Sequence, residues 1–227
     1  MSCPKCRTPL ERNERLYCQK CDVHYHPPPN VWGKPVDEVG CLDDANNVFY
    51  AKLGDSVFIV KQPRIVDLSQ IKEALKLASE YTYLRFPSWM WKHAEGVCYM
   101  PIYRKDTKNR LFLIMVLDGE IVGLSQHRYW HLTKEDKERE GFPVPAGSLC
   151  GVANFCILDT YQRQGLGTIY AKVSEYIVKH NGAKLMIGET FKEGGALNIR
   201  LKDGWTNFGE RKVEDGSTRV LIGKVLN

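Results

Sequence analysis

The feature that most constrains the fold is a strand that runs through a glycine-containing turn into a long amphipathic helix. Residues 149–158 are predicted to form the strand, and residues 159–167 the polar turn. The pattern predicts a helix of about fifteen residues after the turn, because apolar residues recur there at helical spacing before a helix stop. The helical positions and the stop are Leu166, Ile169, Val173, Ile177 and Asn181-Gly182.

The turn has the geometry of an anion-binding site. Free backbone N–H groups at a helix start point toward a ligand, and the helix macrodipole favours negative charge there. Gly165 and Gly167 permit the close approach of a pyrophosphate, and Arg163 could add positive charge. A Gly-x-Gly turn alone is a weak signal because many tight turns use it, so the flanking elements decide its meaning.

Further elements are predicted before this unit. An apolar strand at 111–117, the Asp118-Gly119 turn and a returning strand at 120–126 predict a β-hairpin. Two short strands, an amphipathic helix and an aromatic segment are predicted ahead of the hairpin, at 47–50, 56–61, 68–81 and 83–103. The aromatic segment either lines a substrate pocket or packs in the core. The charged residues 134–140 predict an exposed loop.

The motif Gln162-x-x-Gly165-x-Gly167 resembles the cofactor motif of the GNAT family of N-acetyltransferases. That family usually has Arg or Gln, two residues, Gly, one residue, and then Gly or Ala at this place. The hairpin looks like the family's second and third strands. Residues 184–188 resemble the family's fifth strand, and residues 196–205 resemble the helix and turn after it. Residues 205–213 and 218–225 would be the last two strands. The resemblance covers residues 47–225 and implies an α/β fold with a mixed sheet.

The resemblance also implies acetyl-CoA as the cosubstrate and a direct transfer of its acyl group to an amine. In this family, two splayed strands admit the pantetheine arm, and the pyrophosphate lies on the turn. The cofactor-binding residues implied here are Ile157, Leu158, Gln162, Arg163, Gln164, Gly165, Leu166, Gly167, Thr168 and Asn198. Asn198 could instead orient a water molecule or simply lie on a helix face.

Catalytic candidates follow from the same resemblance. Arg200 stands where the family often has a tyrosine that acts as general acid. A guanidinium cannot donate a proton at neutral pH, although it can stabilise a developing thiolate. The candidate proton acceptors lie at or after the ends of predicted strands and are Glu189, just after the fifth strand, Asp159, His127 and Tyr129. For each of them a capping or surface role is the alternative.

Four cysteines near the N-terminus form two Cys-x-x-Cys pairs. Each pair aims two thiolates at one point, and two pairs complete a tetrahedron of sulfur that suits zinc. The segment resembles a zinc ribbon in which a structural Zn²⁺ is held by Cys3, Cys6, Cys18 and Cys21. Free dithiols or a redox pair are the alternative, and His24 or His26 could substitute as ligands. The prolines 27–29 favour a stiff spacer, so we expect a zinc ribbon and linker at 1–29 and an acyltransferase domain at 30–227.

Composition and charge bear on the protein's partners and on its location in the cell. The net charge of +5 permits an anionic partner without requiring one. The longest apolar run, residues 111–117, is far shorter than the ~20 residues that span a bilayer, and the N-terminus lacks a signal-peptide core. We therefore expect a cytoplasmic protein with no membrane contact.

Two classes of function remain open. The first is an acetyl-CoA-dependent N-acyltransferase whose zinc ribbon docks a macromolecular acceptor, namely a protein, a tRNA or a modified DNA base. The second is a non-catalytic adaptor of the same fold that binds nucleic acid or protein through the ribbon. Arg200 in place of tyrosine favours the adaptor, whereas the intact turn from Gln162 to Gly167 favours the enzyme.

Overall fold

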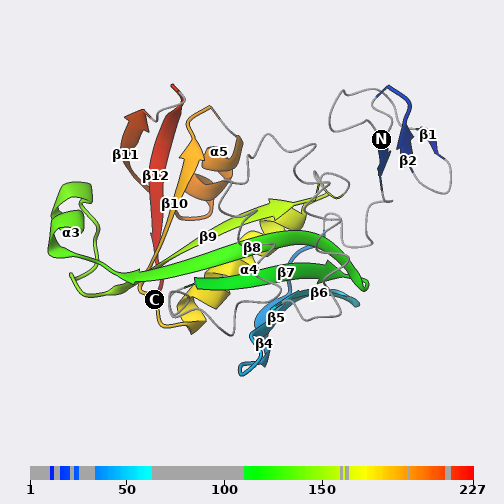
Figure 1. Ribbon diagram of the computed structural model, residues 1–227, viewed down its shortest axis with the longest axis horizontal. Coiled ribbons are helices and arrows are strands. Elements are labelled where there is room, and N and C mark those ends of the chain that lie inside the picture. Colours follow the sequence, from blue (N-terminus) through cyan, green and yellow to red (C-terminus); the bar gives the residue numbers. More distant parts are fainter. Residues whose placement is uncertain are drawn as a thin grey trace. The chain divides into compact units, whose positions relative to one another are not determined.

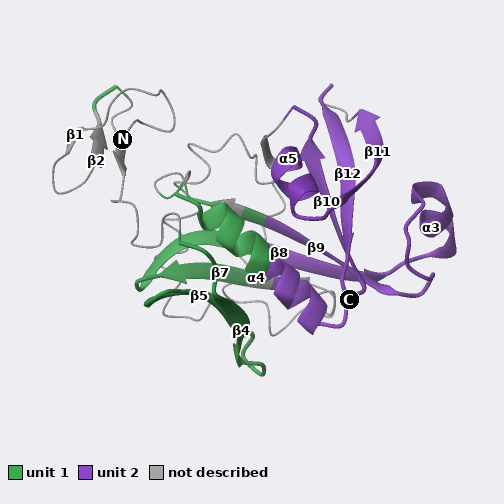
Figure 2. Ribbon diagram, turned by 180° about the vertical axis from the view of Figure 1, so that it is seen from behind, with its two compact units in different colours: residues 1–105, 112–125, 155–173 green, residues 106–111, 126–154, 174–227 purple. Residues whose placement is uncertain are grey.

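The described residues of a computed structural model of the chain form two compact units (Figure 2). They are residues 11–12, 16–20, 23–25, 34–62, 110–158, 161, 164–193, 195–212 and 216–227. Unit 1 takes residues 1–105, 112–125 and 155–173, and unit 2 takes 106–111, 126–154 and 174–227. The predicted helix at 68–81 and the aromatic segment at 83–103 lie outside the described residues.

Unit 1 contains a small antiparallel sheet near the N-terminus (Figure 1). Its strands are β1 (Glu11–Arg12), β2 (Leu16–Cys18) and β3 (Val23–Tyr25). Cys18, the first cysteine of the second Cys-x-x-Cys pair, is the last residue of β2, and the turn residues Gln19 and Lys20 follow it. Cys3, Cys6 and Cys21 lie outside the described residues, and only the backbone of Cys18 is described.

The larger part of unit 1 is an antiparallel meander. Its strands are β4 (Glu38–Asp43), β5 (Val48–Leu53), β6 (Ser56–Lys61), β7 (Arg110–Leu117) and the first half of β8 (Glu120–His131). Apolar side chains at alternate positions of β5 and β6 are buried, as is typical of strands with one face on a core. These side chains are Phe49, Ala51, Leu53, Phe58 and Val60.

The predicted hairpin between β7 and β8 is confirmed. Asp118 and Gly119 both have positive φ, 50° and 84°, which is the backbone of a type I′ turn. This turn matches the right-handed twist of the strands that it joins, and Asp-Gly is a favoured sequence for it. The hairpin thus fixes where β8 begins.

Unit 2 holds a mixed sheet, which confirms the predicted α/β class. The second half of β8 neighbours β9 (Leu149–Ile157), followed by β10 (Leu185–Phe191), β12 (Thr218–Val225) and β11 (Thr206–Lys212). The β9–β10 pair is parallel, whereas β12 runs antiparallel to both β10 and β11. Two helices belong wholly to this unit, α3 (Lys134–Glu140) and α5 (Gly195–Lys202).

Two apolar clusters stabilise unit 2. One contains Leu132, Phe142, Val144, Cys150, Leu185, Ile187 and Leu221. The other contains Val178, Ala183, Met186, Trp205, Val220, Ile222 and Leu226. Met186 and Ile187 are consecutive residues of β10, so the two clusters lie on opposite faces of that strand.

The predicted helix after the glycine turn is confirmed as α4 (Leu166–His180), which gives its first half to unit 1 and its second half to unit 2. Its four predicted core positions are all buried. Asn181 ends it as predicted, because its N–H and its side-chain amide both donate to the carbonyl of Ile177, at 3.1 and 2.8 Å. In the part of the chain that is described, no helix is long and apolar enough to cross a bilayer.

The prediction of an exposed loop at 134–140 was wrong in its backbone, because these residues form α3. The Thr133 hydroxyl accepts a hydrogen bond from the Asp136 N–H at 3.0 Å, and Gly141 closes the helix with a φ of 70°. None of its residues is buried. Strand β4 was not predicted at all, since its sequence Glu-Val-Gly-Cys-Leu-Asp has little apolar alternation.

Candidate functional site

The start of α4 in unit 1 carries the predicted anion-binding turn. Leu166, Ile169 and Tyr170 are buried and anchor the first turn of the helix. Gly165 precedes them with a φ of 82°, a left-handed conformation that favours glycine. Gly165 and Thr168 are exposed, so the turn is open to a ligand on this side.

The backbone N–H groups of the turn divide into two sets. Those of Thr168 and Ile169 both donate to the carbonyl of Gly165, at 3.0 and 3.1 Å. Those of Gly165, Leu166 and Gly167 have no acceptor among the described residues. Three adjacent amide donors at a helix N-terminus form a site for an anion. Thr168 can therefore offer its hydroxyl to a ligand, while its amide is already engaged.

The space around the two glycines suits a bulky anion. Among the described residues, a Cβ atom on Gly165 would meet nothing within 4 Å, and one on Gly167 would meet only Cε2 of Phe155, at 3.8 Å. The left-handed φ explains Gly165, but no close packing among the described residues requires glycine at 167. Glycine at 167 leaves the backbone accessible to a ligand that approaches it closely.

The predicted pantetheine contacts at the end of β9 are buried. Ile157 and Leu158 are 8% and 4% exposed. The Leu158 N–H donates to the Val122 carbonyl at 3.0 Å, and the Leu158 carbonyl accepts from the Tyr161 N–H at 2.8 Å. Leu158 can thus offer a ligand only the second lone pair of its carbonyl oxygen. Gln164 is buried as well, while Gln162, Arg163 and Asp159 lie outside the described residues.

The parallel ladder between β9 and β10 is short. It pairs Leu185 with Cys150 and Met186 with Gly151, and it ends there although both strands continue. Beyond this point β10 stays paired with β12 as far as Phe191 and Arg219. Where a strand leaves its neighbour, its backbone groups can bond to a ligand that carries amides.

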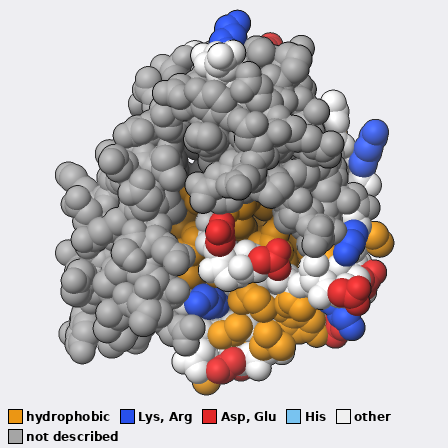
Figure 3. Space-filling view, turned by 90° about the vertical axis from the view of Figure 1, so that its right-hand side faces the viewer, with side chains coloured by type: hydrophobic (Ala, Val, Ile, Leu, Met, Phe, Trp, Pro, Cys, Tyr) orange, Lys and Arg blue, Asp and Glu red, His pale blue; other side chains and the backbone are white. Residues whose placement is uncertain are grey.

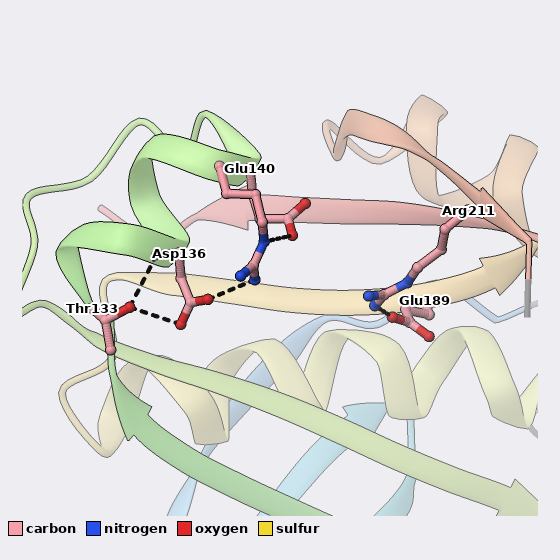
Figure 4. A network of polar contacts seen from close by, with 6 residues as sticks. Thr133, Asp136, Glu140, Glu189 and Arg211 are labelled. Carbon is pink, nitrogen blue, oxygen red and sulfur yellow. Dashed lines mark hydrogen bonds and ion pairs between the residues drawn. The ribbon is translucent and has the colours of Figure 1, made fainter.

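Glu189 does not follow the fifth strand as predicted but lies within β10, opposite Leu221 of β12. Pairing with β12 carries the strand three residues past the predicted end. The Glu189 carboxylate forms an ion pair with Arg211 of β11 (Figure 4). Accepting a proton from a substrate would break this pair.

Two further candidates lie in α5. The Arg200 guanidinium lies over the Trp205 ring, 4.7 Å from its centroid, and Trp205 is buried. Arg200 is thus partly held by an aromatic surface. Asn198 is exposed on the same helix.

His127 and Tyr129 neighbour each other on β8, with ring centroids 6.5 Å apart. His127 is fully buried, and desolvation lowers its pKa to about 3, so the imidazole is neutral. Desolvation raises the pKa of the Tyr129 phenol well above its ordinary value. The Tyr129 hydroxyl has no hydrogen-bond partner within the described part of the chain. Either residue could reach a substrate only through a relay.

Three contacts near the candidate residues were not predicted, and two of them involve a candidate directly. Arg211 pairs with Glu189, Trp205 carries Arg200, and Glu120 accepts a hydrogen bond from Tyr161. No local pattern marks such partners, since Tyr161 and Glu120, for example, are 41 residues apart. Pairing of β10 and β11 with β12 brings Arg211 to Glu189, whereas Trp205 meets Arg200 just after the end of α5.

Figure 3 shows one face of the molecule, where basic side chains lie singly among acidic and apolar ones. A continuous stripe of Lys and Arg, the usual footprint of a nucleic-acid site, is not seen among the described residues on this face.

The strand order, the hairpin, the short parallel ladder and the glycine turn before α4 together define the GNAT fold. No family model matches the sequence, and no curated protein matches it either. Solved structures do share the fold, and among them are acetyltransferases of the GNAT family.

Three of these structures illustrate the likeness. A GNAT-family acetyltransferase from Streptococcus pneumoniae is 15% identical, with a TM-score of 0.53 over 74% of this chain and 99% of its own. A ribosomal L7/L12 alpha-N-protein acetyltransferase in complex with coenzyme A is 9% identical, with a TM-score of 0.55 over 78% and 98%. The ribosomal-protein-S18-alanine N-acetyltransferase from Escherichia coli is 12% identical, with a TM-score of 0.51 over 75% and 94%. Identities this low show a shared fold.

Proposed function

We propose that the protein is an acetyl-CoA-dependent N-acyltransferase. The observation that carries this proposal is the set of three adjacent amide donors at Gly165, Leu166 and Gly167, at the N-terminus of α4 in a GNAT fold. The amides would bind the diphosphate of the coenzyme. Arg163, Gln162 and the Thr168 hydroxyl would add donors from the sequence motif, and the end of β9 would contact the pantetheine arm.

The proposed reaction is a direct transfer that depends mostly on alignment. A neutral amine attacks the thioester carbonyl, the C–N bond forms, and the C–S bond breaks to release the coenzyme thiolate. The ammonium proton passes to a base, and a proton reaches the thiolate. We propose Asp159 or Glu189 as the base and Arg200 as an electrostatic partner of the thiolate. His127 and Tyr129 would act only through a relay.

A substitution at Gly167 tests the coenzyme site. Gly165 is a poor target, because its φ of 82° would strain any side chain. At Gly167, Asp and Asn have nearly the same size, but only Asp adds negative charge, which a helix N-terminus tolerates well. We expect Gly167→Asp to weaken CoA binding about ten- to a hundredfold more than Gly167→Asn does, as measured by calorimetry. Equal affinities in the two variants would contradict an anion at this turn.

The acceptor is proposed to be an amine on a macromolecule, and a protein amine is the first to test. Two of the structures that share the fold act on ribosomal proteins. A tRNA or a modified DNA base remains the other proposal. Labelled acetyl-CoA, incubated with the protein and separate pools of protein, tRNA and DNA, should label one pool.

We also propose that residues 1–29 form a zinc ribbon with Cys3, Cys6, Cys18 and Cys21 as ligands, joined to the domain at 30–227. Four thiolates match the donor set of structural zinc. The end of β2 supports the proposal, because Cys18 is followed there by a turn at Gln19 and Lys20, the two residues between the cysteines of the second pair.

Two contacts favour a second candidate function, a non-catalytic adaptor. Glu189 is ion-paired with Arg211, and Arg200 stacks on Trp205, so two catalytic candidates already have structural partners. An adaptor would bind CoA saturably but release no thiol with any amine. Thiol release that depends on an added amine would support the enzyme instead.

A further inference from the structure

The turn that leads into α4 is held by a side chain from a hairpin far away in the sequence. The Tyr161 hydroxyl donates a hydrogen bond to Oε2 of Glu120. Glu120 is the first residue of β8, directly after the type I′ turn. Tyr161 is only 7% exposed, so its ring is fixed by packing as well.

Backbone hydrogen bonds hold the same place. The Tyr161 N–H donates to the Leu158 carbonyl at 2.8 Å, and the Leu158 N–H donates to the Val122 carbonyl at 3.0 Å. All four residues belong to unit 1. Together these bonds attach the chain before the turn to the first three residues of β8.

The chain after the turn is attached by apolar packing. Leu166 is 1% exposed, and the Phe155 ring, next to Gly167, lies 4.7 Å from the Tyr170 ring. The three amide donors thus lie between two anchored points, Tyr161 and Tyr170, and Leu166 among them is itself buried. Anchoring on both sides reduces the ordering that a ligand must impose on the turn, and this lowers the cost of binding.

We propose that Tyr161 and Glu120 are positioning residues for the diphosphate of acyl-CoA. They orient the amides of Gly165, Leu166 and Gly167 toward one point without touching the ligand themselves. The inference rests on the proposed function of this turn and adds the residues that set its geometry.

The variant Tyr161→Phe tests the proposal, because it keeps the ring and removes the hydroxyl. Its affinity is compared for CoA, by calorimetry, and for pantetheine, which lacks the diphosphate, by NMR titration. A hydrogen bond to a carboxylate is strong enough that we expect CoA binding to weaken about three- to tenfold, with pantetheine affinity within about twofold of wild type. A general loss of structure would weaken the binding of both ligands.

The chain offers a matched control. The Tyr50 hydroxyl donates to Oε1 of Glu38 between β5 and β4, which is the same kind of hydrogen bond at another place in unit 1. Tyr50→Phe should leave CoA affinity unchanged. Glu120→Gln keeps an acceptor oxygen and should bind CoA nearly as well as wild type, whereas Glu120→Ala should match Tyr161→Phe.

Three results would overturn the inference. They are an unchanged CoA affinity in Tyr161→Phe, an equal loss for CoA and pantetheine, and an equal loss in Tyr50→Phe. If wild-type protein binds no CoA, the proposed function fails and the inference fails with it. If wild type binds CoA and Tyr161→Phe binds it equally well, the inference alone fails.

Discussion

At the scale of single residues, a substitution of Tyr129 distinguishes a structural role of this side chain from a catalytic one. Its buried hydroxyl has no partner among the described residues, and a buried polar group without a partner destabilises the folded state. Tyr129→Phe should leave the free energy of unfolding unchanged or raise it by up to about 1 kcal/mol, with acyl transfer retained. Denaturant unfolding and steady-state rates check both parts. If Tyr129 were a general acid or base, Tyr129→Phe would instead lower kcat about a hundredfold.

His127 gives a second prediction at this scale, through pH. Its folded-state pKa of about 3 is below the ordinary value near 6.5, so the unfolded chain binds a proton that the folded chain does not. Stability should therefore fall as the pH drops below about 6.5, by up to ~1.4 kcal/mol per pH unit for this group. Between pH 6.5 and pH 4.5, the free energy of unfolding should fall more in wild type than in His127→Gln. Parallel losses would mean that His127 becomes protonated in the folded protein.

Single residues also show where sequence reasoning ends. The glycine turn and the core positions of α4 follow local rules of backbone conformation and periodicity, so they could be predicted. Partners such as Arg211 for Glu189 could not be, because they meet only through the pairing of β10 and β11 with β12. The burial of His127 likewise depends on what packs on β8 and leaves no mark in its own sequence.

At the scale of elements, α3 depends on its caps. It has no buried residue, so the Thr133 cap and an ion pair between Arg139 and Asp136 at 2.6 Å stabilise it in place of packing (Figure 4). Thr133→Ala should destabilise this helix by about 1 kcal/mol. Hydrogen exchange at the amides of Lys137 and Gly141 should become faster, while exchange in α4 should not change. Uniform acceleration in both helices would contradict a local effect.

The same element explains a failed prediction. Helix periodicity is visible when one face is apolar, as in α4, and a seven-residue helix with no apolar face gives no such signal. The capping pattern from Thr133 to Asp136 and the glycine at 141 were the available clues. Strand β4 was missed for a related reason, since pairing with β5 forms it and its own composition does not.

At the scale of the whole molecule, we expect zinc binding and CoA binding to be independent of each other. We expect the purified protein to contain zinc, and Cys3→Ser to lose it and to unfold residues 1–26 while CoA affinity stays unchanged. Metal analysis, proteolysis and calorimetry measure the three effects. Cys150→Ala is the control, because Cys150 is buried in β9 and lies outside the four predicted ligands. A loss of CoA affinity in Cys3→Ser would make the ribbon a support for the larger domain.

The fold class could be predicted at this scale because one motif was surrounded by elements in the right order. The mixed sheet and the hairpin confirm that prediction. The acceptor could not be predicted, because the residues that would select it have no fixed spacing in sequence.

The exposed helix α3 has a practical consequence for anyone who wants to attach something to this protein. Since none of its side chains enters a core, a fluorophore, an affinity tag or an inserted peptide at its outer positions should leave the packing of unit 2 intact. Glu135 and Glu138 are exposed there and are natural places for such a reporter.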